Sequence, residues 1–478
     1  MGIAMLQKKK QVVVVGNGMA SLRFCEKLLE YDAFHEYRMM VLGDEPVPAY
    51  DRVALSSAFE EQSEKDLILA EARWYESQKI ELRLGLRVVE INRTDRCVTT
   101  HTGIIINYDI LVMATGARPH IPAIPGTGLG GVHVYRTLDD IAAIRQDGLS
   151  ASGAVVIGGG LLGLEAAEIC KKKGLQTTII ERAPHLMACQ LDAAGGQLLS
   201  SKIEALGIAV RTSEHVTGLE GADSVEAVKL EGGASILADL VILATGILPN
   251  DALGREAGLQ IGSKGGIAVD ETVRSSDSRI YAIGECASYN NITFGLIAPC
   301  YAMAEAAAAH LGGINKTFHA AVPASQLKLL DLQVASIGNP LLKEPHAHSV
   351  VVQDADRGVY KKLVTDPEGK YLLGTILMGE TSEFSRLQKR IEDRTELPDH
   401  PENLLAPIGA PFEPELDMEE DDVVCFCNYV TKGDICRAID RDNLKTTGDV
   451  MGVTYAAGLC GSCIDTVNSV TKLHLSQG

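Results

Sequence analysis

The fold of this chain is decided by residues 154–163, which read Ala154-Val155-Val156-Ile157-Gly158-Gly159-Gly160-Leu161-Leu162-Gly163. An apolar run followed by closely spaced glycines predicts a buried strand, a tight turn and the start of a helix. The next strand, Thr177 to Ile180, ends at Glu181, about 20 residues beyond the glycines, where dinucleotide-binding folds carry a ribose-binding acid. These residues therefore predict a Rossmann-like domain that binds a dinucleotide.

An earlier copy of the pattern lies near the N-terminus. Residues 12–15 are four valines, and they lead into Gly16-Asn17-Gly18-Met19-Ala20-Ser21 and a helical pattern. The first glycine permits the turn, the second lets the backbone approach a pyrophosphate at the helix N-terminus, and the small Ser21 allows close helix–strand packing. The following strand, Tyr37 to Leu42, ends at Gly43-Asp44-Glu45, where an acid can bind ribose hydroxyls.

Glu181 bears on which nicotinamide nucleotide is used. A carboxylate at this strand end favours NAD, because it would repel the additional phosphate of NADP, and the neighbouring Arg182 weakens that preference. The sequence predicts NAD(P)H as the reductant with NADH preferred. It leaves open that Glu181 is only a polar strand end.

Three further apolar runs accompany the two glycine motifs. Residues 111–119 and 241–250 are near-repeats, each a buried strand that ends in Ala-Thr-Gly, and residues 280–287 form another strand with Glu285 at its tip. Together these elements resemble the two-dinucleotide-domain flavoproteins, also called pyridine nucleotide-disulfide oxidoreductases. In that family FAD occupies the first fold and NAD(P)H the second, so the resemblance implies both cofactors.

The resemblance also implies roles for individual residues. Glu285 would contact the ribityl chain of FAD, the helix from Ala302 to Leu311 would point its N-terminus at the flavin, and Glu165 would be the catalytic candidate near the flavin–nicotinamide contact. Alternatively, Glu165 is a first-turn carboxylate that complements the helix dipole. The expected cofactor-binding residues are Gly16, Gly18, Ser21, Asp44, Glu45, Arg52, Thr115, Gly116, Gly158, Gly160, Gly163, Glu181, Gly246, Gly284 and Glu285.

The segment after the first strand-end acid distinguishes branches of the family. Thiol-dependent members carry cysteine there, whereas residues 46–57 contain none. The run Tyr50-Asp51-Arg52-Val53-Ala54-Leu55-Ser56 instead resembles the ferredoxin-reductase-like branch, in which a lysine often follows the serine; this chain has Ser57. The resemblance therefore favours electron transfer over disulfide reduction.

Four cysteines near the C-terminus form two close pairs, Cys425-Phe426-Cys427 and Cys460-Gly461-Ser462-Cys463. Paired thiolates at such spacing hold zinc or an iron–sulfur cluster. Because the chain also carries two dinucleotide motifs and zinc does no redox chemistry, we expect an iron–sulfur cluster ligated by these four cysteines. Structural zinc and disulfides are the alternatives.

The residues around these cysteines resemble a bacterioferritin-associated-ferredoxin-like (BFD-like) module, a small helical unit that carries a 2Fe–2S cluster. All the motifs in this order resemble the N-terminal portion of the assimilatory NAD(P)H nitrite reductase large subunit, and the electron-transfer subunit of assimilatory nitrate reductase. The resemblance implies electron flow from NADH to FAD, to the cluster, and then to a separate nitrate or nitrite reductase catalytic subunit. Nitrite reductases continue into sirohaem and 4Fe–4S domains, so we expect this chain not to reduce nitrite alone.

Two other functions stay open at this point. The cysteine module could be a regulatory or zinc-binding element on a flavoprotein scaffold. The chain could also be a subunit of a flavoenzyme that oxidises an amine or amino acid, since some such complexes combine similar modules.

The length of 478 residues and the changes in composition predict several domains. We expect an α/β fold with two Rossmann-like domains, a small α/β domain containing strands Leu327–Ile337, Tyr360–Val364 and Tyr371–Met378, and a small helical 2Fe–2S domain. Residues rich in Pro, Glu and Asp predict a solvated linker before the cysteine module. The expected boundaries are 1–122 with 250–315 for FAD, 123–249 for NAD, 316–396 for the small domain, 397–422 for the acidic linker and 423–478 for the cluster domain.

The net charge of −19 argues against nucleic acid as a partner. No stretch approaches the length of a membrane span, and the apolar run of residues 12–15 is too short for a signal-peptide core. The other seven cysteines are scattered singly, which is typical of a reducing compartment and predicts a cytoplasmic protein. Assembly into a homodimer stays open.

Overall fold

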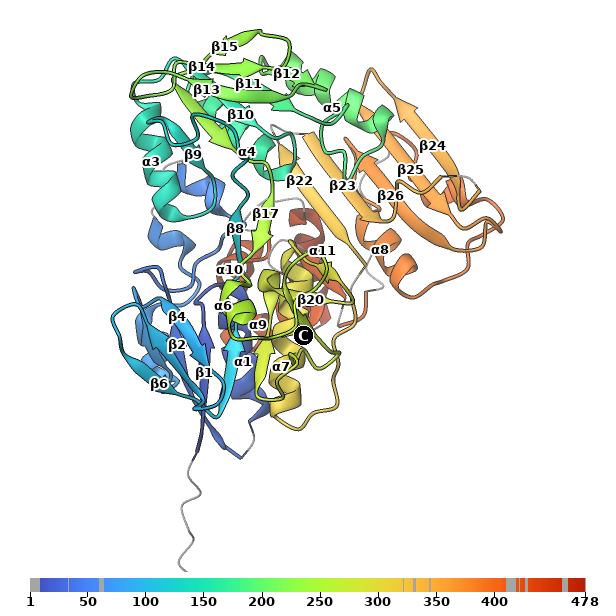
Figure 1. Ribbon diagram of the computed structural model, residues 1–478. Coiled ribbons are helices and arrows are strands. Elements are labelled where there is room, and N and C mark those ends of the chain that lie inside the picture. The colour runs from blue at the N-terminus through green and yellow to red at the C-terminus, as the bar shows by residue number, and fades with distance from the viewer. Residues whose placement is uncertain are drawn as a thin grey trace, which may run out of the picture. The chain divides into compact units, whose positions relative to one another are not determined.

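The computed structural model of the chain describes residues 9–32, 34–59, 64–320, 322–329, 332–343, 345–409, 418–420, 422–425, 429–457 and 463–477. They fall into two compact units, Met1–Pro119 with Ile247–Ala320, and His120–Gly246 with Ala321–Gly478. Helices and strands are mixed in both units (Figure 1), which confirms the expected α/β fold class.

A parallel sheet forms the centre of the first unit, with the strand order β19-β7-β1-β2-β3. Its strands are β1 (Lys10–Val15), β2 (Tyr37–Leu42), β3 (Glu81–Arg83), β7 (Ile110–Met113) and β19 (Ile280–Ala282). The valines of β1 are buried, as expected for a strand covered on both faces. Because neighbouring strands run parallel, their carboxyl ends share one edge of the sheet, and the loops that follow them meet there.

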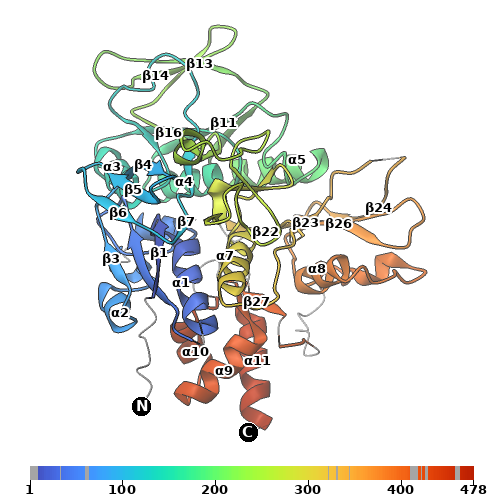
Figure 2. The ribbon, with the colours of Figure 1, turned by 60° about the horizontal axis from the view of Figure 1, so that its bottom comes forward.

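Two helices, α1 (Met19–Tyr31) and α7 (Ile297–Leu311), pack against each other beside this sheet (Figure 2). Their small residues, such as Ala304 and Ala308, are buried and allow the close approach. The remaining elements of the unit are α2 (Ala72–Ser77), α6 (Ala252–Glu256), the sheet of β4 (Val88–Asn92), β5 (Cys97–Thr100) and β6 (Ile105–Asn107), the pair β8 (Ala117–Pro119) and β17 (Ile247–Pro249), the sheet of β18 (Ile267–Val269), β20 (Ala287–Tyr289) and β21 (Ile292–Thr293), and 3₁₀ turns at Leu55–Phe59, Glu64–Leu67 and Gly284–Cys286.

The second unit begins with another parallel sheet, ordered β12-β11-β10-β16-β9. These strands are β9 (Val132–Val134), β10 (Gly153–Ile157), β11 (Gln176–Glu181), β12 (Ala209–Thr212) and β16 (Leu240–Leu243). The accompanying elements are α3 (Leu138–Gly148), α4 (Leu161–Lys172), α5 (Ala193–Ala205) and the antiparallel sheet of β13 (Val216–Glu220), β14 (Ala227–Leu230) and β15 (Ser235–Leu237). Glu181 is the last residue of β11, so it lies at the carboxyl edge of this sheet.

An antiparallel sheet ordered β22-β23-β26-β25-β24 follows, with α8 (Phe384–Glu392) packed on β23 and β26 (Figure 1). Its strands are β22 (Ala324–Leu329), β23 (Leu332–Gly338), β24 (His348–Asp354), β25 (Val359–Thr365) and β26 (Leu372–Met378). The prediction of one strand over Leu327–Ile337 is wrong, because β22 and β23 pair antiparallel with Leu329 opposite Leu332. Both strands mix apolar and polar residues in a similar way, so the sequence pattern did not mark the reversal of chain direction between them.

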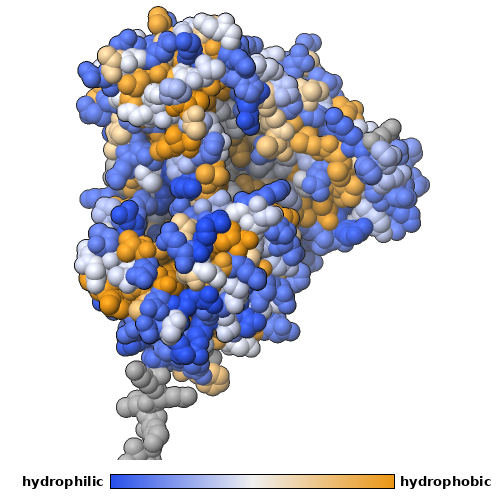
Figure 3. Space-filling model, in the orientation of Figure 1, coloured by the Kyte–Doolittle hydropathy of each residue, from blue (hydrophilic) through white to orange (hydrophobic). Residues whose placement is uncertain are grey.

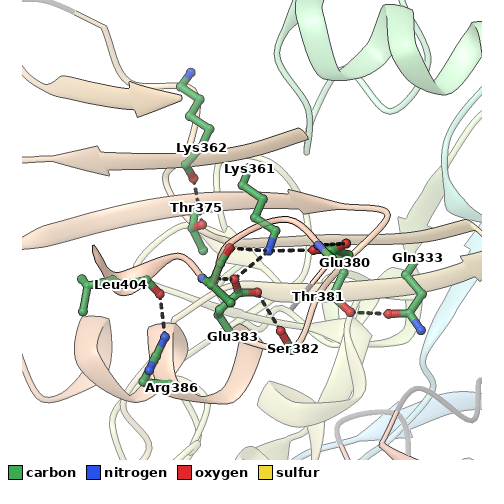
Figure 4. Close-up of polar contacts among 12 residues, drawn as sticks. Gln333, Lys361, Lys362, Thr375, Glu380, Thr381, Ser382, Glu383, Arg386 and Leu404 are labelled. Atoms are coloured by element: carbon green, nitrogen blue, oxygen red, sulfur yellow. Dashed lines mark hydrogen bonds and ion pairs between the residues drawn. The ribbon is translucent and has the colours of Figure 1, made fainter. Parts of the chain in front are cut away.

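The antiparallel sheet of β22 to β26 and α8 form a domain that we call the third domain. Residues 404–409 pack on it. Leu404 and Leu405 are buried in its core, the backbone N–H of Gly409 donates to Glu380, and Arg386 Nη2 donates to the Leu404 carbonyl at 2.6 Å (Figure 4). These residues fall in the stretch expected to be a solvated linker. Two adjacent leucines give this part of the stretch an apolar anchor that its average composition conceals.

A buried lysine holds the same segment. Lys361 on β25 is fully buried, and its Nζ lies 2.8 Å from Glu383 Oε1 and 3.3 Å from Glu380 Oε2 (Figure 4). Lys361 Nζ also donates to the carbonyl of Ala406, whose N–H donates to Glu383 at 2.7 Å. Pairing on this scale compensates for the desolvation of the buried charge.

The C-terminal module is small and mainly helical, as expected. It comprises β27 (Val423–Cys425), β28 (Val430–Thr431), α9 (Lys432–Asp442), α10 (Thr447–Thr454) and α11 (Ile464–Gln477), and the three helices are seen in Figure 2. Thr431 and Thr446 begin α9 and α10 with reciprocal capping hydrogen bonds, which explains where these short helices start. Lys389 on α8 forms an ion pair of 2.8 Å with Asp422, next to β27.

Hydrophilic residues predominate on the face shown in Figure 3, and apolar residues gather in separate patches. Among the described residues, no helix combines the length and the apolar character that crossing a bilayer requires.

Candidate functional site

The first glycine turn joins β1 to α1 at the carboxyl edge of the sheet. Gly16 has a φ of +107°, and a Cβ there would lie 2.2 Å from the carbonyl oxygen of Ala114, so only glycine fits. A Cβ at Gly18, by contrast, would meet no atom within 4 Å. The turn is therefore closed toward the sheet and open above the start of the helix.

Two polar side chains of this turn each carry a buried atom that has no hydrogen-bond partner among the described residues. They are Asn17, through its buried Nδ2, and Ser21, whose hydroxyl belongs to a side chain that is only 1% exposed. Buried polar atoms are ordinarily paired, so unpaired ones in a turn that is open at Gly18 are what a polar ligand would satisfy. The turn thus fits the pyrophosphate-bearing part of a dinucleotide such as FAD.

The acids that follow β2 differ in their surroundings. Asp44 is exposed, whereas Glu45 accepts a hydrogen bond of 2.8 Å from the hydroxyl of Tyr50 and forms an ion pair with Arg52. The Arg52 guanidinium also lies over the Tyr50 ring, 4.6 Å from its centroid. The structure therefore brings Glu45 and Arg52 together as a pair and leaves Asp44 open to solvent.

Thr115 and Gly116 follow β7 and are bound to a return segment of the same unit. The Thr115 hydroxyl donates to the Asn250 carbonyl at 2.7 Å, the Asn250 side chain donates back to the Thr115 carbonyl, and Asn250 N–H donates to the Gly116 carbonyl. These bonds explain the polar character of the Ala-Thr-Gly motif structurally. Any contact with the cofactor would use the remaining faces of these residues.

Gly284 and Glu285 follow β19 at the same edge. Gly284 has a φ of +77°, and Glu285 is half-buried in the 3₁₀ turn that begins there. The neighbouring Cys286 is fully buried and its thiol donates to the carbonyls of Met113 and Ile283. The sheet topology thus gathers Gly16, Gly18, Ser21, Asp44, Glu45, Arg52, Thr115, Gly116, Gly284 and Glu285 in the first unit.

The second glycine turn, between β10 and α4, repeats the backbone design. Gly158 has a φ of +117°, and a Cβ there would lie 2.3 Å from the Ala244 carbonyl oxygen. A Cβ at Gly163 would lie 1.9 Å from the Gly158 oxygen, whereas one at Gly160 would meet nothing within 4 Å. Gly246, which has a φ of +111° and open space around it, follows β16 in this unit.

Glu181 is hydrogen-bonded to the backbone of the second turn. Its carboxylate accepts the backbone N–H of Gly159 at 2.6 Å and that of Ala183 at 2.6 Å. A carboxylate has about four acceptor positions, so two are left for the hydroxyls of a ribose. The two backbone bonds also hold the glycine turn and the residues after β11 to the strand end.

Glu165 lies in the first turns of α4 and is half-buried. Burial raises the pKa of this carboxyl to about 7, and the nearby carboxylate of Glu168 adds to the effect. Glu168 itself pairs with Lys172 at 3.1 Å. Glu165 can therefore carry a proton near neutral pH, which an ordinary glutamate does not.

Cys425 and Cys463 are buried in one small core with Val450 and Val467. Cys427 and Cys460 lie outside the described residues. Within the part of the chain that the structure describes, which omits those two cysteines, no three His, Cys, Asp or Glu side chains are close enough to hold a metal ion. The described half of the donor set consists of buried sulfurs, which suits an iron–sulfur cluster.

Residues 10–312 match the pyridine nucleotide-disulphide oxidoreductase family. The chain belongs to this family. Residues 323–395 match the rubredoxin NAD+ reductase C-terminal domain, and residues 423–472 match the BFD-like [2Fe-2S] binding domain. The combination confirms the expected cofactor classes, with FAD and NAD(P)H in the reductase part and a 2Fe–2S cluster in the module.

Similar proteins place this oxidoreductase more narrowly. It is 38% identical to the nitrite reductase (NADH) large subunit of Escherichia coli, over 98% of this chain and 56% of that protein. It is 33% identical to the assimilatory nitrate reductase electron transfer subunit of Bacillus subtilis, over 97% of this chain and 60% of that protein. The chain thus spans a little over half the length of these relatives.

A solved structure supports the fold of the reductase part. A ferredoxin reductase from Rhodopseudomonas palustris superposes with a TM-score of 0.75 at 25% identity, covering 81% of this chain and 96% of that one.

Sequence reasoning missed one polar group in the site, the side chain of Asn17. Its Oδ1 accepts a hydrogen bond of 3.0 Å from the hydroxyl of Tyr75 on α2. Glycine motifs tolerate most residues at this position, so the motif gave no signal. The link to Tyr75 joins residues that are 58 positions apart, and only the folded chain reveals it.

Proposed function

We propose that this chain is an NADH-dependent flavoprotein reductase, which passes electrons from NADH through FAD and a 2Fe–2S cluster to a separate nitrate or nitrite reductase. The observation that carries the proposal is the union, in one chain, of two dinucleotide-binding turns and a cysteine module matching a [2Fe-2S] binding domain. When bound, FAD exchanges electrons in pairs or singly, so it links a two-electron hydride donor to a one-electron cluster.

The first unit would hold FAD. The turn of residues 16–21 offers unpaired donors beside open space, and Arg52 places a positive charge, shared with Glu45, after β2. We assign the expected set from Gly16 to Glu285 in this unit to FAD binding. The reason is that all of these residues follow the carboxyl ends of neighbouring parallel strands.

The second unit would hold NADH. Gly160 leaves room for the pyrophosphate at the start of α4, and Glu181 keeps acceptor capacity for the ribose diol. A second phosphate on that ribose would meet the Glu181 carboxylate, so NADPH should bind less well. Glu165, protonated in part near pH 7, can donate a hydrogen bond to a carbonyl of the nucleotide, and we propose it as the catalytic candidate on that ground.

The module would carry electrons outward. Cys425, Cys427, Cys460 and Cys463 would ligate the cluster. The chain that leads to the module is held on the third domain by Lys361 and Glu383, and again by the ion pair of Lys389 with Asp422. We therefore propose a carrier whose attachment is anchored at both ends, in place of a freely solvated tether through residues 397–422.

The partner and the compartment are part of the proposal. The two relatives are named for nitrite and nitrate reduction, which supports a nitrate or nitrite reductase as the acceptor. The seven scattered single cysteines support a cytoplasmic location.

The experiment measures cofactors and electron transfer together. Protein purified without oxygen should contain FAD, iron and acid-labile sulfide, and NADH should reduce both flavin and cluster. Adding a nitrate or nitrite reductase catalytic subunit from the same organism should give NADH-dependent reduction of nitrate or nitrite. Zinc without iron would favour a regulatory module, and flavin bleaching by an amine with no response to NADH would favour an amine-oxidising enzyme.

A further inference from the structure

Asn17 presents a polar group that the reaction assigned above does not use. Its Nδ2 is buried and has no hydrogen-bond partner among the described residues, although Asn17 stands in the turn between Gly16 and Gly18. An amide nitrogen buried without an acceptor destabilises the folded protein. Such a group persists where a ligand supplies the missing acceptor.

The position of this side chain is fixed by its neighbours. The Tyr75 hydroxyl donates to Asn17 Oδ1 at 3.0 Å, and Tyr75 is only 1% exposed, within the main core of the first unit. Because the hydroxyl occupies the oxygen side of the amide, the nitrogen side is turned away from Tyr75. The amide is therefore held with its donor group directed away from Tyr75 and without an acceptor among the described residues.

The place where Asn17 lies indicates what the acceptor is. A Cβ built on Gly43 would be 3.1 Å from Asn17 Cβ, so this side chain lies against the end of β2, directly before Asp44 and Glu45. On its other side Gly18 leaves open space at the N-terminus of α1. Asn17 thus stands between the position for a pyrophosphate and the strand-end acids that would bind a ribose.

We propose that the side-chain amide of Asn17 binds FAD directly, by donating a hydrogen bond to an oxygen in the pyrophosphate–adenosine ribose segment, and that Tyr75 is its positioning residue. The proposal rests on the assignment of FAD to the first unit. It adds a side-chain donor to a turn whose other contacts with the phosphates would come from backbone N–H groups. No bond is made or broken, so the role is one of affinity and orientation.

The test measures the Kd of FAD for apoprotein by quenching of flavin fluorescence. Asn17→Ala should weaken binding on the order of tenfold or more, the loss expected for a hydrogen bond to a charged group. Asn17→Asp keeps the size and the acceptor for Tyr75 but places a carboxylate where an oxygen acceptor should lie, so it should weaken binding further. Tyr75→Phe, which only frees the amide to rotate, should have the smallest effect.

A second readout separates ligand binding from a structural role. Loss of a structural hydrogen bond would lower the melting temperature of apoprotein and FAD-loaded protein alike. Because Asn17→Ala also removes the acceptor of the Tyr75 hydroxyl, this readout compares Tyr75→Phe with Tyr75→Phe/Asn17→Ala, in which no tyrosine hydroxyl is left unpaired. Loss of a ligand contact should lower the melting temperature of the double variant relative to Tyr75→Phe only when FAD is bound. Asn107→Ala, at an exposed asparagine on β6, is the matched control and should change neither quantity.

The outcomes are distinguishable. A Kd within twofold of wild type for both Asn17→Ala and Asn17→Asp would overturn the proposal and leave FAD binding intact. An equal drop in melting temperature with and without FAD would also overturn it. Failure of the wild-type protein to bind FAD at all would instead overturn the proposed function on which it rests.

Discussion

The two glycine turns share a backbone design but differ in how their polar groups are satisfied. In the first turn, Asn17 Nδ2 and the Ser21 hydroxyl have no partner among the described residues. In the second, the N–H of Gly159 donates to Glu181 at 2.6 Å, and the third glycine packs directly on the first. The first turn therefore carries polar side chains without a described partner, whereas residues 158–163 of the second carry no polar side chain.

This difference is what a resident cofactor and an exchangeable nucleotide require. A nucleotide that leaves in every turnover empties its site, so unpaired buried groups there would destabilise the protein each time. A cofactor that stays bound can satisfy such groups permanently. The comparison therefore agrees with the proposal that FAD occupies the first turn and NADH the second.

Ser21 in the first turn and Gly163 in the second occupy corresponding positions, and exchanging these residue types should have the largest effect on stability. Gly163→Ser places a side chain where a Cβ would lie 1.9 Å from a backbone oxygen, so we expect the free energy of unfolding of the second unit to fall by about 4 kcal/mol or more. Ser21→Gly only removes a buried hydroxyl that has no described partner and should cost at most about 1 kcal/mol. Urea unfolding measures both. Comparable losses for the two variants would show that the turns are packed alike.

The middle glycines should separate the two ligands. Neither Gly18 nor Gly160 has an atom within 4 Å of the Cβ position, so alanine should leave the melting temperature of the ligand-free protein nearly unchanged at both. Gly18→Ala should yield protein depleted of flavin. Gly160→Ala should retain flavin and raise the KM for NADH by about tenfold or more, since each tenfold corresponds to only 1.4 kcal/mol. Flavin content and steady-state kinetics check this, and flavin loss from Gly160→Ala alone would reverse the assignment.

Glu181 should control the choice of nucleotide. Glu181→Gln keeps an oxygen for the Gly159 N–H but removes the charge, so the ratio of kcat/KM for NADH over NADPH should fall by about tenfold. Glu181→Ala should abolish the preference for NADH over NADPH and should also destabilise the turn. Rates of flavin reduction by each nucleotide give the result. If the wild type uses both nucleotides equally, the exposed Arg182 dominates the ribose site.

Substitution of Glu165 should have the smallest effect on stability, and the size of that effect should depend on pH. Burial raises the pKa of Glu165 from the ordinary 4.5 to about 7, so between these values the folded protein keeps a proton that the unfolded chain has lost. The contribution of this residue to stability must therefore decrease as pH rises through that window. Glu165→Gln should remove that part of the slope in the unfolding free energy measured from pH 4.5 to 7.5. An unchanged slope would show that the carboxyl titrates normally.

The sequence predicted both strand–turn–helix units because each of them is local. Glycine spacing and strand-end acids determine a turn within about 30 residues, so Gly16, Gly158 and Glu181 could be placed before the fold was known. The partners of these residues could not. Tyr75 reaches Asn17 from another helix, and Arg52 pairs with Glu45 only after the loop has folded.

The third domain shows the same limit. Lys361 stands in a predicted strand, where a charge normally signals an exposed face, yet it is fully buried by two glutamates that follow β26. Leu404 and Leu405 were hidden in an acidic, proline-rich stretch whose average composition indicates solvent. Burial of a charge and docking of a short apolar pair both depend on partners distant in sequence.

We propose that electrons leave the flavin through the cysteine module, and one measurement tests this path directly. Stopped-flow absorbance would follow NADH-driven reduction of wild type and of Cys425→Ser, with nitrate or nitrite turnover measured in parallel after adding the partner reductase. The account predicts that Cys425→Ser reduces its flavin, and a small acceptor such as ferricyanide, at nearly the wild-type rate, while turnover with the partner is lost. Full turnover by a Cys425→Ser protein shown to lack iron and sulfide would contradict the account, because the cluster would then lie outside the electron path.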